Sequence, residues 1–214
     1  MTCTAQIRCL LLVLLVALTL CGVPAAADDG GWRNGPKDNK AVAEPRGAGS
    51  SDFDLAFSVR RTANDAVDET NTALAYANCQ ACRGIAVAFQ IVIVQGSPGT
   101  VKPQNVAVAV NDRCPGCSVL AVAHQFVVGR GEPLEFTERG HDRLEKIRDR
   151  LEDLEDDYDE LTNDQIRART DASAVKIRDI LARDLVAARS RGDDDDDETR
   201  GPPIGRESSD DDDG

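Results

Sequence analysis

Residues 79–96 read CQACRGIAVAFQIVIVQG, and residues 114–131 read CPGCSVLAVAHQFVVGRG. At a constant offset of 35, 8 of these 18 positions are identical, including both cysteines of each pair. The apolar segments that lead into the pairs, residues 73–77 and 106–110, match best at an offset of 34. We interpret residues 73–131 as a duplicated unit of strand, Cys-x-x-Cys turn and longer strand.

The longer strands of this unit, residues 85–94 and 119–128, are apolar and β-branched on both faces. This composition is typical of strands covered on both sides. Upstream, residues 53–59 alternate apolar and polar side chains, which predicts a half-buried strand and places the start of order near Asp52. A loop rich in Gly and Pro separates the two units. We therefore predict a mostly antiparallel five-stranded sheet over residues 52–131.

Beyond Pro133 the pattern changes to that of helices, and we expect a helical hairpin over residues 132–191 and an α+β fold. Thr162 and Gln165 have the spacing of a capping box, which predicts the start of the second helix. The apolar stripe is expected to pack on its own domain, with a coiled-coil seam for self-association as the alternative. In the first helix the stripe consists of Leu144, Ile147, Leu151, Leu154, Tyr158 and Leu161.

Both ends of the chain differ in composition from the centre. Residues 1–27 contain Arg8 and a short apolar run and end in three consecutive alanines, which predicts a cleaved signal peptide and no membrane span after cleavage. Residues 28–51 are rich in Gly, Pro and charge, which predicts a disordered leader. Residues 192–214 hold eleven acidic residues and predict a disordered acidic tail. We expect a secreted or cell-envelope protein.

The formal charge of −13 is concentrated in that tail. The tail contributes −9, because two arginines offset its eleven acidic residues, and the rest of the chain contributes the remaining −4. A nearly balanced body without a basic stripe argues against nucleic acid as a partner.

Removal of the signal peptide also removes three of the seven cysteines. An even number of thiols in an oxidising compartment predicts disulfides, which we prefer, with no cofactor. The four that remain are Cys79, Cys82, Cys114 and Cys117. Three pairings are open: 79–82 with 114–117, 79–114 with 82–117, and 79–117 with 82–114.

Two other chemistries are compatible with these four cysteines. Two Cys-x-x-Cys turns resemble the knuckles of a zinc ribbon, in which four thiolates would bind one metal ion. Alternatively, Cys114-Pro115-Gly116-Cys117 resembles a thioredoxin motif, although such cysteines open a helix and the residues after Cys117 indicate a strand.

Motifs of common hydrolases are missing from the sequence. It has no His-Glu-x-x-His, no Gly-x-Ser-x-Gly and no phosphate-binding loop, so we assign no catalytic residue. The chain has two histidines. His124 takes the place of Phe89 in the repeat, which predicts a packed side chain, and His141 begins a charged helix, which predicts a solvated one.

Several segments resemble a family of uncharacterised exported actinobacterial proteins with paired Cys-x-x-Cys repeats. The resemblance covers roughly residues 52–189, and some members are labelled as peptide zinc metalloproteases. It implies secretion and a shared architecture. The segments that carry it are residues 76–82, 86–90, 110–117, 125–129 and 166–170.

Together these observations predict a secreted or cell-envelope structural or interaction protein, with a disulfide-stapled sheet and an unknown protein or cell-envelope component as its partner. The alternatives are a zinc-ribbon-like or metalloprotease-related protein and a thiol-disulfide oxidoreductase.

Overall fold

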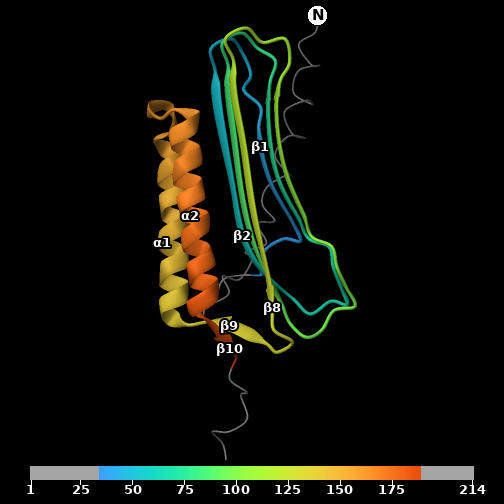
Figure 1. Cartoon of the computed structure of the whole chain (residues 1–214). Coiled ribbons are helices and arrows are strands. Elements are labelled where there is room, and N and C mark those ends of the chain that lie inside the picture. Colours follow the sequence, from blue (N-terminus) through green and yellow to red (C-terminus); the bar gives the residue numbers. More distant parts are fainter. Residues whose placement is uncertain (1–33, 189–214) are drawn as a thin grey trace, which may run out of the picture. The chain divides into compact units, whose positions relative to one another are not determined.

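The computed structural model describes residues 34–188 (Figure 1). The predicted signal peptide and acidic tail lie outside these residues. The described part of the chain contains ten strands and two α-helices. The first eight strands are β1 (Asp38–Ala43), β2 (Ser51–Thr62), β3 (Ala66–Val67), β4 (Thr70–Ala77), β5 (Arg83–Val94), β6 (Thr100–Val101), β7 (Gln104–Asn111) and β8 (Ser118–Gly129).

These strands form three parallel sheets. One sheet has the order β1-β4-β7, the second has the order β2-β5-β8, and β3 pairs with β6 in the third. Consecutive long strands of the chain therefore lie in different sheets, and each strand pairs with its equivalent in the next repeat. The chain winds through three stacked coils, which are β1 to β3, β4 to β6, and β7 with β8. This arrangement is a parallel β-solenoid.

The predicted antiparallel five-stranded meander is thus wrong. It assumed that each Cys-x-x-Cys turn folds the two strands of one unit against each other, whereas the turn is a corner between two sheets. The duplication itself is confirmed, because the register pairs Ile85 with Leu120 at an offset of 35. The lead-in strands pair Ala73 with Ala107 at an offset of 34. Parallel stacking of equivalent residues is what a repeat of this length produces in a solenoid.

The first coil also begins earlier than the sequence predicted. Residues 28–51 were expected to form a leader, but β1 lies within them and pairs with β4 in parallel. The pairing places Asn39 beside Asn71 and Ala41 beside Ala73, so the start of the chain repeats the asparagine and alanine pattern of the later coils.

The space between the two larger sheets is filled by small side chains. Its apolar part is a cluster of buried alanines from β1, β4 and β5. Its polar part is a ladder of three asparagines, in which the Asn39 amide donates to Asn71 Oδ1 at 2.8 Å and the Asn71 amide to Asn105 Oδ1 at 2.9 Å. The same amides also donate to backbone carbonyls of the opposite sheet, which satisfies buried polar groups. The alanines are Ala41, Ala43, Ala73, Ala75, Ala86 and Ala88.

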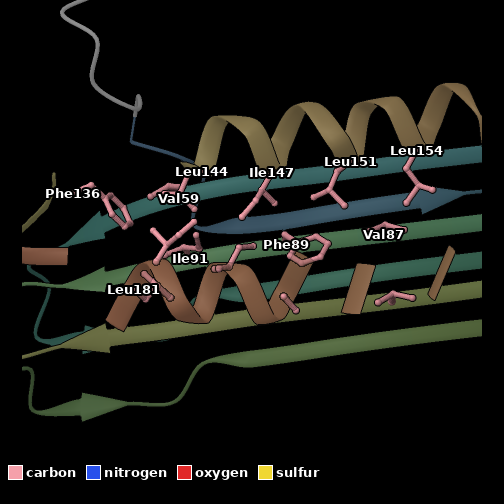
Figure 2. Close-up of a cluster of buried hydrophobic side chains, with 14 of the residues drawn as sticks. Val59, Val87, Phe89, Ile91, Phe136, Leu144, Ile147, Leu151, Leu154 and Leu181 are labelled. Atoms are coloured by element: carbon pink, nitrogen blue, oxygen red, sulfur yellow. The ribbon is translucent and has the colours of Figure 1, made fainter. Parts of the chain in front are cut away.

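The outer face of the β2-β5-β8 sheet is covered by a helical hairpin of α1 (Glu138–Asp156) and α2 (Asn163–Arg183). Leu144, Ile147 and Leu151 of α1 pack with large apolar side chains of the sheet, including Phe89 and Ile91 (Figure 2). The predicted hairpin and its packing on the sheet are therefore confirmed. The capping box at Thr162 is also present, with both of its hydrogen bonds. Covered by alanines on one face and helices on the other, β5 is buried along nearly its whole length.

A short antiparallel pair, β9 (Leu134–Phe136) and β10 (Leu185–Ala187), closes the hairpin. Beside it, the buried Asp184 carboxylate accepts hydrogen bonds from Arg139 Nε at 2.8 Å and from Arg143 Nη1 at 2.6 Å. Between residues 34 and 188 there is no helix with the length and apolarity that crossing a membrane requires.

The asparagine ladder gives a first prediction. Replacement of Asn71 by Ala removes one acceptor of the Asn39 amide and the donor to Asn105 Oδ1 and to the Ala88 and His124 carbonyls inside the solenoid, so the free energy of unfolding should fall by about 2–4 kcal/mol. The matched control is Asn105→Ala at the end of the ladder, where in the monomer water can replace the lost bonds and the loss should stay below about 1 kcal/mol. Urea unfolding measures both values, and equal losses would contradict the ladder's role.

A second prediction concerns acid stability. Hydrogen bonds from Arg139, and secondarily from Arg143, lower the pKa of Asp184 in the folded protein. The resulting stability is complete above about pH 4, the pKa of an unfolded aspartate, and is lost as the pH falls through the folded pKa. Unfolding followed from pH 7 to pH 2 should therefore show a smaller acid loss in Asp184→Asn than in the wild type. Asp149→Asn, at an exposed site on α1, should retain the wild-type dependence.

Candidate functional site at the cysteine corner

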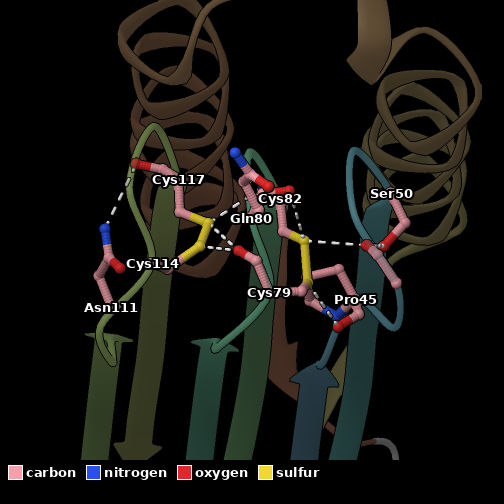
Figure 3. Close-up of a disulfide and its surroundings, with 9 residues drawn as sticks. Pro45, Ser50, Cys79, Gln80, Cys82, Asn111, Cys114 and Cys117 are labelled. Carbon is pink, nitrogen blue, oxygen red and sulfur yellow. Dashed lines mark hydrogen bonds between the residues drawn. A yellow bond between two sulfur atoms is a disulfide. The ribbon is translucent and has the colours of Figure 1, made fainter.

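The four predicted cysteines lie together at one corner of the solenoid (Figure 3). Residues 78–82 connect β4 to β5, and residues 112–117 connect β7 to β8, so the two turns stack because their coils stack. We call these two turns the cysteine corner. Residues 44–50 make the equivalent turn of the first coil without cysteines.

Each pair closes within its own motif. Cys79 and Cys82 are at disulfide distance, with their Cα atoms 5.7 Å apart, and Cys114 and Cys117 are paired likewise, with a Cα separation of 5.5 Å. Of the three pairings that the sequence left open, the structure has 79–82 with 114–117. Neither pair connects two coils.

The backbone of both turns follows one pattern. The third residue of each motif, Ala81 and Gly116, has a positive φ, of 56° and 75°. Gly116 follows Pro115, and the Cys117 N–H donates to the Cys114 carbonyl at 3.3 Å, as in a turn with Pro and Gly at its centre. Gly takes this conformation at little cost, whereas Ala81 adopts it against the steric preference of an L-residue.

Backbone hydrogen bonds, rather than the sulfur pairs, connect the three stacked turns. The Gly49 N–H donates to the Gln80 carbonyl at 2.8 Å, and the Ala81 N–H donates to the Pro115 carbonyl at 3.1 Å. In addition, the Cys82 N–H donates to Cys117 Sγ at 3.0 Å. The corner is therefore a continuous stack from the first coil to the third.

The surroundings of the sulfurs differ from those of a reactive thiol. Carbonyl oxygens face them, with Pro45 O 3.3 Å from Cys79 Sγ and Gly47 O 3.0 Å from Cys82 Sγ. The strands β5 and β8 follow the two motifs, so neither motif has the helix amino terminus that stabilises a thiolate. Within residues 34–188, no group of three or more His, Cys, Asp and Glu side chains has the arrangement of a metal site.

Sequence reasoning missed a residue that fixes this corner to the helices. Arg83, the first residue of β5, donates to the Tyr158 carbonyl at 2.9 Å and to the Leu161 carbonyl at 2.6 Å. It also donates to Asn163 Oδ1, while the Asn163 amide donates to Ser118 Oγ at 2.8 Å. The turn between α1 and α2 is thereby bound to both coils that carry cysteines. These partners lie far along the chain from Arg83, and no local motif marks them.

The structure confirms the prediction for one histidine and contradicts the prediction for the other. His124 packs over Phe89, with ring centroids 5.0 Å apart, which confirms the position predicted from the repeat. Burial lowers its pKa, against the opposing effect of Asp171, whose Oδ1 lies 3.2 Å from His124 Nε2. His141 was predicted to be solvated, and this is wrong: it is half-buried against Phe136, and burial lowers its pKa.

Comparisons with protein-family models, curated proteins and solved structures give no match to this chain.

Loss of the Arg83 contacts should loosen the helical hairpin. Arg83→Ala removes charge-assisted hydrogen bonds to two carbonyls, and we expect it to lower the free energy of unfolding by about 1.5–3 kcal/mol. Arg83→Lys should restore only part of this loss, since an ammonium cannot reproduce the planar fork. Arg113→Ala is the matched control, because Arg113 lies in the other turn of the corner and is 92% exposed. A comparable effect of both alanine variants in urea unfolding would contradict the role of Arg83 in holding the helical hairpin on the cysteine corner.

Proposed function

We propose that this chain is a secreted or cell-envelope structural or interaction protein, whose solenoid is a rigid scaffold. The observation that carries this proposal is that the asparagine ladder and Arg83 form hydrogen bonds that hold parts of the fold together. The asparagine ladder joins the coils from inside. Arg83 binds the helical hairpin to the cysteine corner. Each of these groups is engaged in holding the coils and the hairpin together, as expected of a scaffold.

The cysteines have a structural role in this proposal. A disulfide within each motif would close a loop of four residues and stabilise the fold by about 2 kcal/mol in the chain-entropy estimate. That is less than a bond between coils would contribute, since loop-closure entropy grows with loop length. The bonds would instead hold two tight turns at the corner, including the one that places Ala81 at a positive φ.

A zinc-ribbon-like binding module is the second proposal. It is favoured by the gathering of four cysteines in one cluster and by the Cys82 N–H, which donates to Cys117 Sγ, although the paired sulfurs of the described residues do not have the arrangement of a metal site. Thiolates that bind zinc accept hydrogen bonds of this kind. Both pairs would have to be reduced for the four sulfurs to bind one ion.

Intact-mass measurement of the exported protein distinguishes these proposals. Under denaturing conditions, reduction should add about four hydrogens, two for each disulfide, and the native mass should contain no metal. The mass should also correspond to a chain that begins at residue 28. A zinc-sized addition in the native spectrum, with no change on reduction, would replace the first proposal by the second. Turnover of a model disulfide that depends on Cys114 would instead establish an oxidoreductase.

A further inference from the structure

The two ends of the solenoid differ. At the first coil, the outer edge of β1 is covered by carboxylates of β2: the Val42 N–H donates to Asp54, and the Glu44 N–H donates to Asp52 Oδ2 at 2.6 Å. The outer edge of β2 is covered by the residues before β1, where the Gly35 N–H donates to the Val59 carbonyl at 2.8 Å. This end has little capacity to pair with another strand.

Among residues 34–188, nothing covers the third coil in this way. β7 and β8 are the last strands of their sheets, and no strand within residues 34–188 pairs with their outer edges. β7 reads QNVAVAVN, is exposed throughout and contains no charged residue or proline. Natural proteins usually protect an edge with charges, prolines or a covering segment, so an uncovered edge of this composition is a site for strand addition.

β7 also presents a row of valines. Val106, Val108 and Val110 alternate with small residues, so they share the outer face of the strand, and each is 37–38% exposed. The alternate residues Ala107 and Ala109 pair with Ala73 and Ala75 of β4, which belong to the alanine interior.

A groove lies at the same end, beside β8. Its volume is about 610 Å³, and its lining includes His124, Phe126 and Val128 of β8 and Arg178 of α2. Helical spacing places Val175, which is 60% exposed, on the same flank of α2 as Asp171, Arg178 and Ala182. A helix flank on which Val175 and Ala182 are exposed beside the charged Asp171 and Arg178 thus accompanies the unpaired edge of β8.

These two surfaces are complementary under a two-fold rotation. β7 and β8 run in opposite directions, because the Asn111 side chain reaches the Cys117 carbonyl and the Asn105 side chain reaches the Ala123 carbonyl. An axis parallel to the strands, passing through the end of the third coil, places β7 of a second copy antiparallel beside β8 of the first. The valine row of that copy then faces α2, and its alanines continue the interior.

We propose that the protein forms a closed two-fold dimer, in which β7 of each copy pairs with the outer edge of β8 of the other and its valine row packs beneath α2. Both pairings form at once and use both open edges of each copy. The first coils, whose edges are covered, then lie at the two ends of the dimer, so no further copy can be added. The proposal does not depend on export or on the state of the cysteines.

The size of the contact is sufficient for such a dimer. At about 3.3 Å per residue, the eight residues of β7 span about 26 Å. The contact is as wide as two sheets about 10 Å apart plus a layer of side chains on either side. This width and the strand length together give a contact area of roughly 600 Å² per copy. The total of roughly 1,200 Å² reaches the lower limit of stable, specific interfaces.

Sedimentation equilibrium of the chain from residue 28 onwards tests this proposal, and the wild type should be a dimer at micromolar concentration. Val108→Lys puts a charge into the centre of the apolar contact and should weaken dimerisation by about 100-fold or more. Val175→Lys changes the opposite surface and should act likewise. Val186→Lys is the control, since Val186 is similarly exposed, at 39%, but lies on β10. Circular dichroism should show that all three variants remain folded.

Hydrogen exchange gives an independent readout. Amides of β7 and β8 that point toward the outer edges should be protected at concentrations where the dimer forms and should lose protection on dilution, whereas amides of β5 should not change. A monomeric wild type at 100 times that concentration range would overturn the proposal. So would a dimer that persists in both Val108→Lys and Val175→Lys, because its contact would then lie elsewhere, for example on the outer faces of the helices.

Discussion

The close approach of the two larger sheets is the constraint on which the rest of the structure depends. Alanine at the interior positions of β1, β4 and β5 permits it, since larger side chains would separate the sheets. An asparagine side chain is short, yet Asn71 donates to the Ala88 and His124 carbonyls of the opposite sheet. The same proximity lets a turn as short as residues 78–82 connect one sheet to the other. The alanines, the asparagine ladder and the tight corners therefore require one another.

A thin interior has an energetic consequence, because alanines bury little apolar area in each coil. The β2-β5-β8 sheet compensates on its other face, where Phe53, Phe89, Ile91 and their neighbours form the large apolar cluster with the helices. Burial of about 25 cal/mol per Å² makes that face the main hydrophobic contribution to stability. The helical hairpin is thus part of the same folding unit as the solenoid, and Arg83 and Asn163 fix its turn in place.

The sequence predicted where the helices and strands lie along the chain better than it predicted which strands pair and in which direction. Periodicity located β2, β5, β8 and the two helices, and the capping box at Thr162 marked the start of α2. Strand direction was not predicted, because strand-turn-strand has the same local pattern in a hairpin and in a coil. A signal for parallel stacking was present in the sequence but was not used. Asn39, Asn71 and Asn105 recur at spacings of 32 and 34, and this recurrence extends the duplication to a third unit. At the site, the repeat brought the cysteines together, but the partners of Arg83 are 75 and 78 residues distant.

The carboxylates of Asp52 and Asp54 make the first coil different from the other two. They occupy positions that Gly84 and Ala86 hold in the next coil, so only the first coil carries its own terminator. The third coil is equally specialised, because the chain leaves it to form the helices. A gene duplication that lengthened this protein could therefore be accommodated only in the middle, by copying the coil of β4 to β6. Chains of different length built in this way would differ in the number of their middle coils and would share the same first and last coils.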